Sequence, residues 1–164
     1  MYKSTKHFGH ELGLSACFRQ WRATSHCRLL HGYPLAFTLT FGASELDERN
    51  WVIDFGGLKD VKAFLVDTFD HKLVVAADDP QAHRLYALGD ELAFTVGTDA
   101  ERQPLADVLV IPNVGCEAFA EYVFNYVKTW LVDAGHSPRV HLISVECREH
   151  GGNSAIYESE TNVR

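Results

Sequence analysis

A thiol and an imidazole four positions apart are the first groups in this chain that could do chemistry. Cys27 and His31 belong to the segment CRLLHG, and Tyr33 follows it directly. Arginines and histidines are concentrated around this segment, and cations near a thiol favour the thiolate, the form that acts as a base or nucleophile. The alternative is a small buried side chain, which is the usual role of a free cysteine.

Two other places carry groups suited to proton transfer or to ligand binding. Asp70 and His71 are adjacent, and a carboxylate can orient or charge a histidine that transfers protons. A solvated helix end, where a charged histidine interacts well with the helix dipole, would explain the same pair. Glu149 stands ahead of the segment HGGNSA and is either a surface carboxylate at a turn or an anchor for a ring with adjacent N–H donors.

The composition limits the class of protein. With 164 residues, 46% hydrophobic and 12% aromatic, the chain is typical of one globular domain over residues 1–164. A formal net charge of −7 argues against a nucleic-acid partner, although a local basic pocket could still bind a phosphorylated small molecule. One local basic cluster is present and consists of Arg19, Arg22, His26, Arg28 and His31.

The sequence also bears on location and redox state. It has no N-terminal apolar run after a basic stretch and no run of about 18 apolar residues, so we expect neither a signal peptide nor a membrane partner. The four cysteines form no C-x-x-C pair, which argues against a zinc ribbon or a thioredoxin-type motif. Free thiols are typical of a cytoplasmic protein.

Hydrophobic periodicity predicts an α+β fold. The predicted helices are 58–69 and 116–135, and the predicted strands are 1–18, 35–43, 51–55, 91–97, 106–111, 139–149 and 154–160. Strands joined by short loops should pair antiparallel, with the two helices on one face of the sheet. We expect other copies of the chain to complete a barrel, because the remaining sheet face must meet something.

Six segments, taken in order along the chain, resemble the motifs of one known family. They are LSACF, CRLLHGY, WVIDFGGLK, FDHK, NVGCEAFAEYV and REHGGNSAIY. The corresponding motifs are a first strand ending in a zinc-binding histidine, C-x-x-x-H-G-H, V-x-D-F-x-x-L-K, D-H-K, N-P-T-x-E-N-L-A and a closing E-T segment. These motifs are those of the 6-pyruvoyl-tetrahydropterin synthase and 6-carboxytetrahydropterin synthase family. The resemblance spans about residues 14–157, and six ordered matches are more specific than any single one.

The resemblance implies a fold, an assembly and a set of roles. The fold would be the tunnelling fold (T-fold), with active sites between the subunits of a homo-oligomer, a hexamer of two trimers. Cys27 would be the thiol that abstracts a proton, and Asp70 with His71 would form the relay from a neighbouring chain. Glu149 would hold the pterin ring of the substrate.

The same resemblance implies a lyase reaction. The substrate would be 7,8-dihydroneopterin triphosphate or a relative, and the enzyme would break a carbon–oxygen or carbon–carbon bond. Members of the family release triphosphate, and the branch in queuosine biosynthesis also cleaves the side chain.

The zinc site of the family is degenerate in this sequence. The family uses three histidines, of which only His31 is present, whereas Phe18 and Tyr33 stand at the other two ligand positions. Catalytic zinc usually has three protein ligands and one open position, and neither of these rings is a good ligand near neutral pH. Cys17 and His26 are near in sequence and could compensate, but strand alternation directs Cys17 away from the side of Phe18.

Two functions therefore remain open. The first is a lyase with altered metal use, which would lack the several kcal/mol that a Lewis acid contributes. The second is a non-catalytic or repurposed pterin-binding homologue without zinc. Gly115 stands where the family has a threonine in the pterin pocket, which leaves the identity of the substrate open as well.

Overall fold

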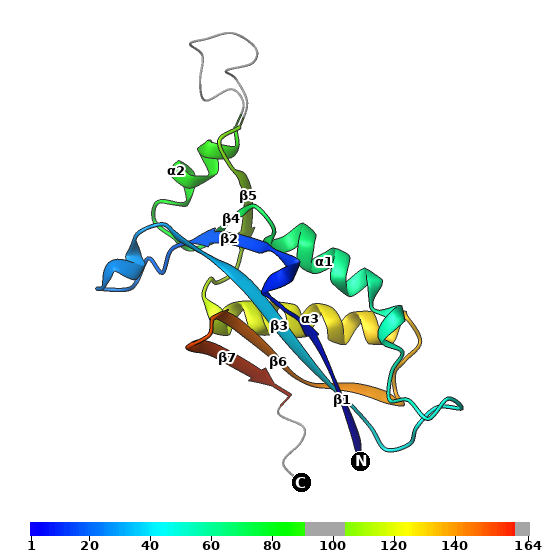
Figure 1. Cartoon of the computed structure of the whole chain (residues 1–164). Coiled ribbons are helices and arrows are strands. Elements are labelled where there is room, and N and C mark those ends of the chain that lie inside the picture. Colours follow the sequence, from blue (N-terminus) through cyan, green and yellow to red (C-terminus); the bar gives the residue numbers. More distant parts are fainter. Residues whose placement is uncertain (91–103, 160–164) are drawn as a thin grey trace.

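The computed structural model describes residues 1–90 and 104–159 and contains a seven-stranded sheet (Figure 1). The strands are β1 (Tyr2–Phe8), β2 (Leu14–Phe18), β3 (His31–Ala43), β4 (Lys72–Ala76), β5 (Asp107–Ile111), β6 (Val140–His150) and β7 (Asn153–Glu158). The α-helices are α1 (Lys59–Phe69), α2 (Ala82–Tyr86) and α3 (Cys116–Asp133). Short 3-10 turns are η1 (His10–Leu12), η2 (His26–Arg28), η3 (Phe55–Gly57) and η4 (Ala87–Gly89).

The long strand β3 is the centre of the sheet. Its first half pairs antiparallel with β2, so that Phe18 lies opposite His31. Its second half pairs with β1 on the same edge, and β6 pairs along the other edge. The strand order β5-β4-β2-β3-β6-β7 places the ends of β2, β3 and β6 side by side.

The segment 1–18 forms two strands instead of the single strand that we predicted. A 3-10 turn between Gly9 and Gly13 separates β1 from β2, and Gly13 has a φ of 76°. Glycine takes this left-handed conformation at little cost, so the chain turns here and continues along the same edge of β3.

The sheet is mixed, because β4 pairs parallel with both β2 and β5. Periodicity predicts no strand at β4, since LVVA after Lys72 is a continuous apolar run without alternation, a pattern shared by strands buried on both faces. The strand predicted at 51–55 is wrong: that segment is a loop with Val52 and Ile53 buried, and it ends in η3. The strand predicted at 91–97 lies outside the described residues.

The remaining predicted elements are confirmed, and the core explains their positions. The side chains of Leu35, Phe37, Leu39 and Phe41 alternate along β3 and are all fully buried. Helices α1 and α3 cover this face of the sheet (Figure 1), where the ring of Phe69 lies 5.0 Å from Phe37 and 5.3 Å from Phe119. Among the described residues, no helix has the length and apolarity needed to cross a membrane.

Candidate active site

Three aromatic rings meet where β2 ends and β3 begins. The ring centroid of Phe18 lies 5.0 Å from that of His31 and 6.2 Å from that of Tyr33, and the last two are 5.5 Å apart. Strand geometry explains the cluster, because Phe18 lies opposite His31, and Tyr33 follows two residues later on the same face. Phe18 is fully buried and packs edge-on against Phe119 at 5.0 Å, whereas His31 and Tyr33 are half-buried.

The side chains of Phe18, His31 and Tyr33 do not fit the three-histidine zinc site that the family motifs imply. His31 Nδ1 lies 2.7 Å from the Leu29 carbonyl oxygen, which only accepts, so Nε2 is the ring nitrogen with a free lone pair. Phe18 has no donor atom. Desolvation raises the pKa of Tyr33, and the negative charges of Glu149 and Cys27 raise it further, so the phenol keeps its proton.

The two possible replacement ligands are not gathered around His31. Cys17 neighbours Phe18 on β2 and is half-buried, and burial raises the pKa of its thiol. Alternation along β2 points this side chain to the opposite face from Phe18. His26 is exposed in η2. Within residues 1–90 and 104–159, no three His, Cys, Asp or Glu side chains are grouped so that they could hold a metal ion.

Cys27 lies in the short turn η2, in the loop between β2 and β3. The hydroxyl of Ser25 accepts a hydrogen bond from the backbone N–H of Cys27 at 3.4 Å. The backbone N–H of Gln20 donates to the Cys27 carbonyl oxygen at 2.9 Å. The thiol is half-buried, and its charge is close enough to raise the pKa of Tyr33. The fold therefore brings the predicted base Cys27 near the cluster of Phe18, His31 and Tyr33.

Glu149 lies near the end of β6, where the pairing with β7 is irregular between Arg148 and His150. Desolvation raises the pKa of this half-buried carboxyl; the positive charges of His150 and His31 oppose the rise, and Glu117 adds to it. Within the described residues, its oxygens accept no hydrogen bond. A desolvated carboxylate without a donor is costly in the free protein and is available to a ligand that brings N–H groups.

Asp70 and His71 lie at the other end of β2. His71 Nδ1 is 2.7 Å from Asp70 Oδ1, and the same oxygen accepts a hydrogen bond from the Ser15 amide at 3.4 Å. The side chain of His71 is 85% exposed. Across the described residues, no hydrogen bond, ion pair or ring contact joins this pair to Cys27 or Glu149, so one copy of the chain does not unite the predicted catalytic residues.

Gln20 contacts the position of Gly115, a neighbour that the sequence patterns missed. Gly115, at the N-terminus of α3, has a φ of 111°, and a Cβ built on it would lie only 2.0 Å from the Gln20 amide nitrogen. The side chain of Gln20 therefore occupies the space that the family's threonine would need at this position. No local pattern marks this residue, because its position depends on how the loop after β2 packs against α3.

Solved structures define the class of fold. An uncharacterized protein from Wolinella succinogenes superposes with a TM-score of 0.76 at 24% identity, covering 97% of this chain and 98% of that one. A 6-pyruvoyl tetrahydropterin synthase from Plasmodium falciparum superposes with a TM-score of 0.64 at 14% identity, covering 96% of this chain and 97% of that one. At these identities the likeness concerns the fold alone, and it confirms the expected tunnelling fold.

Sequence comparison then gives the family. A family profile described as 6-pyruvoyl tetrahydropterin synthase matches residues 9–160. A 6-carboxy-5,6,7,8-tetrahydropterin synthase from Aquifex aeolicus is 25% identical over 148 residues, which are 90% of this chain and 85% of that protein. A protein of the same name from Rickettsia felis is 38% identical over 56 residues, 34% of this chain and 41% of the relative. The chain belongs to the 6-pyruvoyl tetrahydropterin synthase family, as its motifs indicate.

We expect Glu149→Gln to stabilise the free protein at pH 7 and to have no such effect at pH 4. The folded state holds the Glu149 proton up to a higher pH than the unfolded state, whose glutamate pKa is about 4.3. Stability is therefore lost as the pH rises from that value through the raised pKa, and glutamine removes the loss. Thermal unfolding at both pH values measures the effect, with the exposed Glu121→Gln as a control. A lower melting temperature for Glu149→Gln at pH 7 would show that the carboxylate serves the fold instead.

The double variant Phe18→His with Tyr33→His should restore a zinc site beside His31. Zinc should then raise its melting temperature, because a metal at 100 times its Kd adds about 2.7 kcal/mol of stability. The unmodified protein should carry no stoichiometric zinc, and zinc should leave its melting temperature unchanged. Tyr33→His alone is the matched control with two imidazoles. Stoichiometric zinc in the unmodified protein, by elemental analysis, would mean that other ligands are recruited.

Proposed function

We propose that this protein is a lyase that acts on 7,8-dihydroneopterin triphosphate or a related dihydropterin, and that it does so without a three-histidine zinc site. The carboxylate of Glu149 is the observation that carries this proposal. It is half-buried, its pKa is raised by desolvation, and it has no hydrogen-bond donor among the described residues. A pterin ring has adjacent N–H groups, and a carboxylate can accept two parallel hydrogen bonds from them.

Cys27 is the proposed base. Its thiolate removes a proton from a carbon of the pterin side chain, and the electron pair of that C–H bond forms a double bond. The neighbouring C–O bond breaks, and triphosphate leaves with its electron pair. The negative charges of Cys27 and Glu149 both raise the pKa of Tyr33, which supports a shared site for the thiol and the proposed pterin anchor.

Tyr33 and His31 are the proposed partners of the substrate side chain in place of a metal. The Tyr33 phenol keeps its proton and can donate a hydrogen bond to a side-chain oxygen as negative charge develops there. The free Nε2 of His31 can accept a hydroxyl proton. The buried ring of Phe18 contacts both rings and covers one side of each.

A homo-oligomer, a hexamer of two trimers, would complete this site. Asp70 and His71 have no contact with Cys27 within one described chain, so a neighbouring copy is the proposed source of the relay. Exposed apolar side chains support association: Tyr2, Trp51 and Phe55 are 53%, 45% and 43% exposed and line a common hollow.

A pterin-binding protein without catalysis is the second candidate. The observation that favours it is the loss of two ligand positions to Phe18 and Tyr33, which form an aromatic cluster with His31. Such a protein would keep the anchor Glu149 and lose the chemistry.

Substitution of the thiol and of the anchor should separate binding from chemistry. We expect Cys27→Ala to lower triphosphate release by about 10²–10⁴-fold, the usual contribution of a general base, with biopterin affinity unchanged. Glu149→Gln should weaken biopterin binding by about tenfold or more, since a hydrogen bond to a charged group contributes about 1.5–3 kcal/mol. Cys17→Ala, at a second half-buried thiol, is the control for turnover. Tight biopterin binding with no triphosphate release by the unmodified protein would establish the second candidate; no biopterin binding would refute both.

Co-expression of Cys27→Ala with His71→Ala should restore activity that neither variant has alone. If each site takes its thiol from one copy and its histidine from the next, random assembly leaves about a quarter of the sites intact. Assembly is checked by sedimentation, and co-expression of Cys27→Ala with unmodified Cys27 chains serves as the reference. No recovery in correctly assembled mixed oligomers would place the whole relay within one chain.

A further inference from the structure

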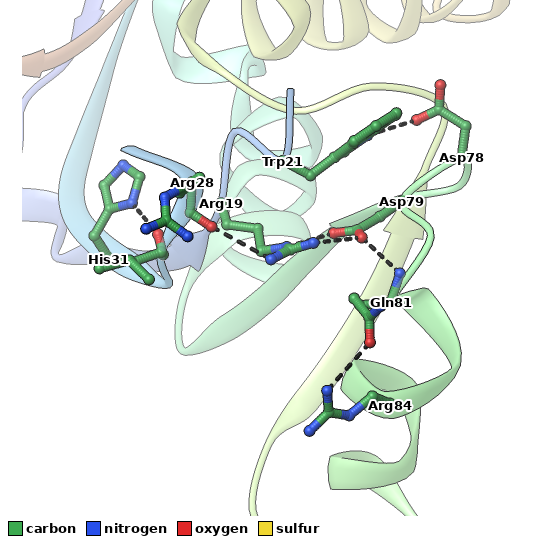
Figure 2. Close-up of polar contacts among 9 residues, drawn as sticks. Arg19, Trp21, Arg28, His31, Asp78, Asp79, Gln81 and Arg84 are labelled. Atoms are coloured by element: carbon green, nitrogen blue, oxygen red, sulfur yellow. Dashed lines mark hydrogen bonds and ion pairs between the residues drawn. The ribbon is translucent and has the colours of Figure 1, made fainter. Parts of the chain in front are cut away.

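A groove of about 390 Å³ lies beside the loop that carries Cys27. Arg19 and Arg28 of that loop line one wall, and Gln81 and Arg84 at helix α2 line the other; Figure 2 shows Arg28 and Arg84 on either side of the Arg19–Asp79 ion pair. Four leucines of the two walls complete the lining. The volume falls within the range of roughly 300–1,000 Å³ that is usual for small-molecule sites.

The groove is positively charged, although the chain as a whole is acidic. Three arginines line it, and no acidic side chain of the described residues does. Among the arginines that the structure describes, only Arg28 and Arg84 have neither a carboxylate nor a backbone carbonyl as partner of their guanidinium groups. Arg84 donates only to the neutral Gln81 Oε1, at 3.2 Å. Acidic residues outnumber Lys and Arg by 22 to 15 in this chain, so a shortage of carboxylates does not explain two arginines without an acidic partner on one groove.

A buried ion pair fastens the two walls together. Arg19 Nε and Nη2 donate to the two carboxylate oxygens of Asp79 at 2.7 and 2.8 Å, and the Asp79 side chain is only 1% exposed. Asp79 also accepts a hydrogen bond from the backbone N–H of Gln81 at 2.8 Å, and Arg19 Nη1 donates to the backbone carbonyl of Arg28 at 3.4 Å (Figure 2). These bonds tie the backbone at Arg28 to the segment before helix α2, so the two walls are already joined before any ligand arrives, which lowers the entropy cost of binding.

We propose that this groove binds the phosphate groups of a phosphorylated ligand. The guanidinium fork of arginine matches phosphate oxygens and can donate two parallel hydrogen bonds to them. The leucines of the lining add apolar surface beside the arginines, which a sugar or ring attached to the phosphates could contact. Arg28 follows Cys27 directly in the chain, so phosphates held here would extend from a ligand at the thiol. This assignment of the ligand rests on the proposed function, whereas the phosphate site itself does not.

Titration with inorganic triphosphate tests the site directly in the full-length protein. We expect calorimetry to detect binding that weakens with added salt. Arg28→Gln and Arg84→Gln should each lower the affinity by about tenfold, and the double variant should bind no measurable triphosphate. Arg49→Gln, at an exposed arginine that pairs with Glu48 and Asp54, is the matched control and should bind normally. No binding by the unmodified protein, or unchanged affinity in the double variant, would overturn the proposal.

Kinetics with 7,8-dihydroneopterin triphosphate then identifies the source of the phosphates. If they belong to the substrate, inorganic triphosphate competes with it, and the double variant raises KM at least tenfold while biopterin affinity stays unchanged. If they belong to a separate ligand, triphosphate binds without raising the KM of the substrate. The titration requires no turnover, so a protein that binds triphosphate but lacks lyase activity would refute the proposed function and leave the phosphate site intact.

Discussion

The antiparallel pairing of β2 with the first half of β3 is the constraint on which the candidate site depends. Its register sets Phe18 opposite His31 and directs Tyr33 to the same face, where β6 brings Glu149. The loop that joins the two strands carries Cys27 and continues into one wall of the arginine groove. A shift of one residue would turn these side chains to the other face of the sheet and separate the thiol from Glu149.

The same pairing explains how ring packing holds the cluster of Phe18, His31 and Tyr33 together. Phe18 belongs to the hydrophobic core through its contact with Phe119, and that contact stabilises the end of β2. A zinc ion would hold three side chains together by coordination, whereas here ring packing does so. Burial then has a second effect, because it raises the pKa values of Tyr33 and Glu149 and leaves both groups prepared for a polar ligand.

The strands and helices whose apolar residues recur with one clear spacing could be predicted from the sequence. Alternation marks β3, and the spacing of apolar residues marks α1 and α3, because each of these elements buries a single face. The strand β4 could not be predicted, since it is buried on both sides and has no alternation. Cys27, His31 and Tyr33 are near in sequence, so their motif reveals them. The contact of Gln20 with Gly115, and the position of Arg84 on the groove beside Arg28, depend on packing between segments far apart in the sequence.

Triphosphate release by the metal-free protein is the most direct test of this account, because the account assigns the chemistry to Cys27, Tyr33 and His31 without zinc. The protein would be treated with a strong chelator, shown to be metal-free by elemental analysis, and assayed with 7,8-dihydroneopterin triphosphate. We predict the same rate before and after chelation, and no increase on addition of zinc. A rate that disappears with the metal and returns with one equivalent of zinc would contradict the account.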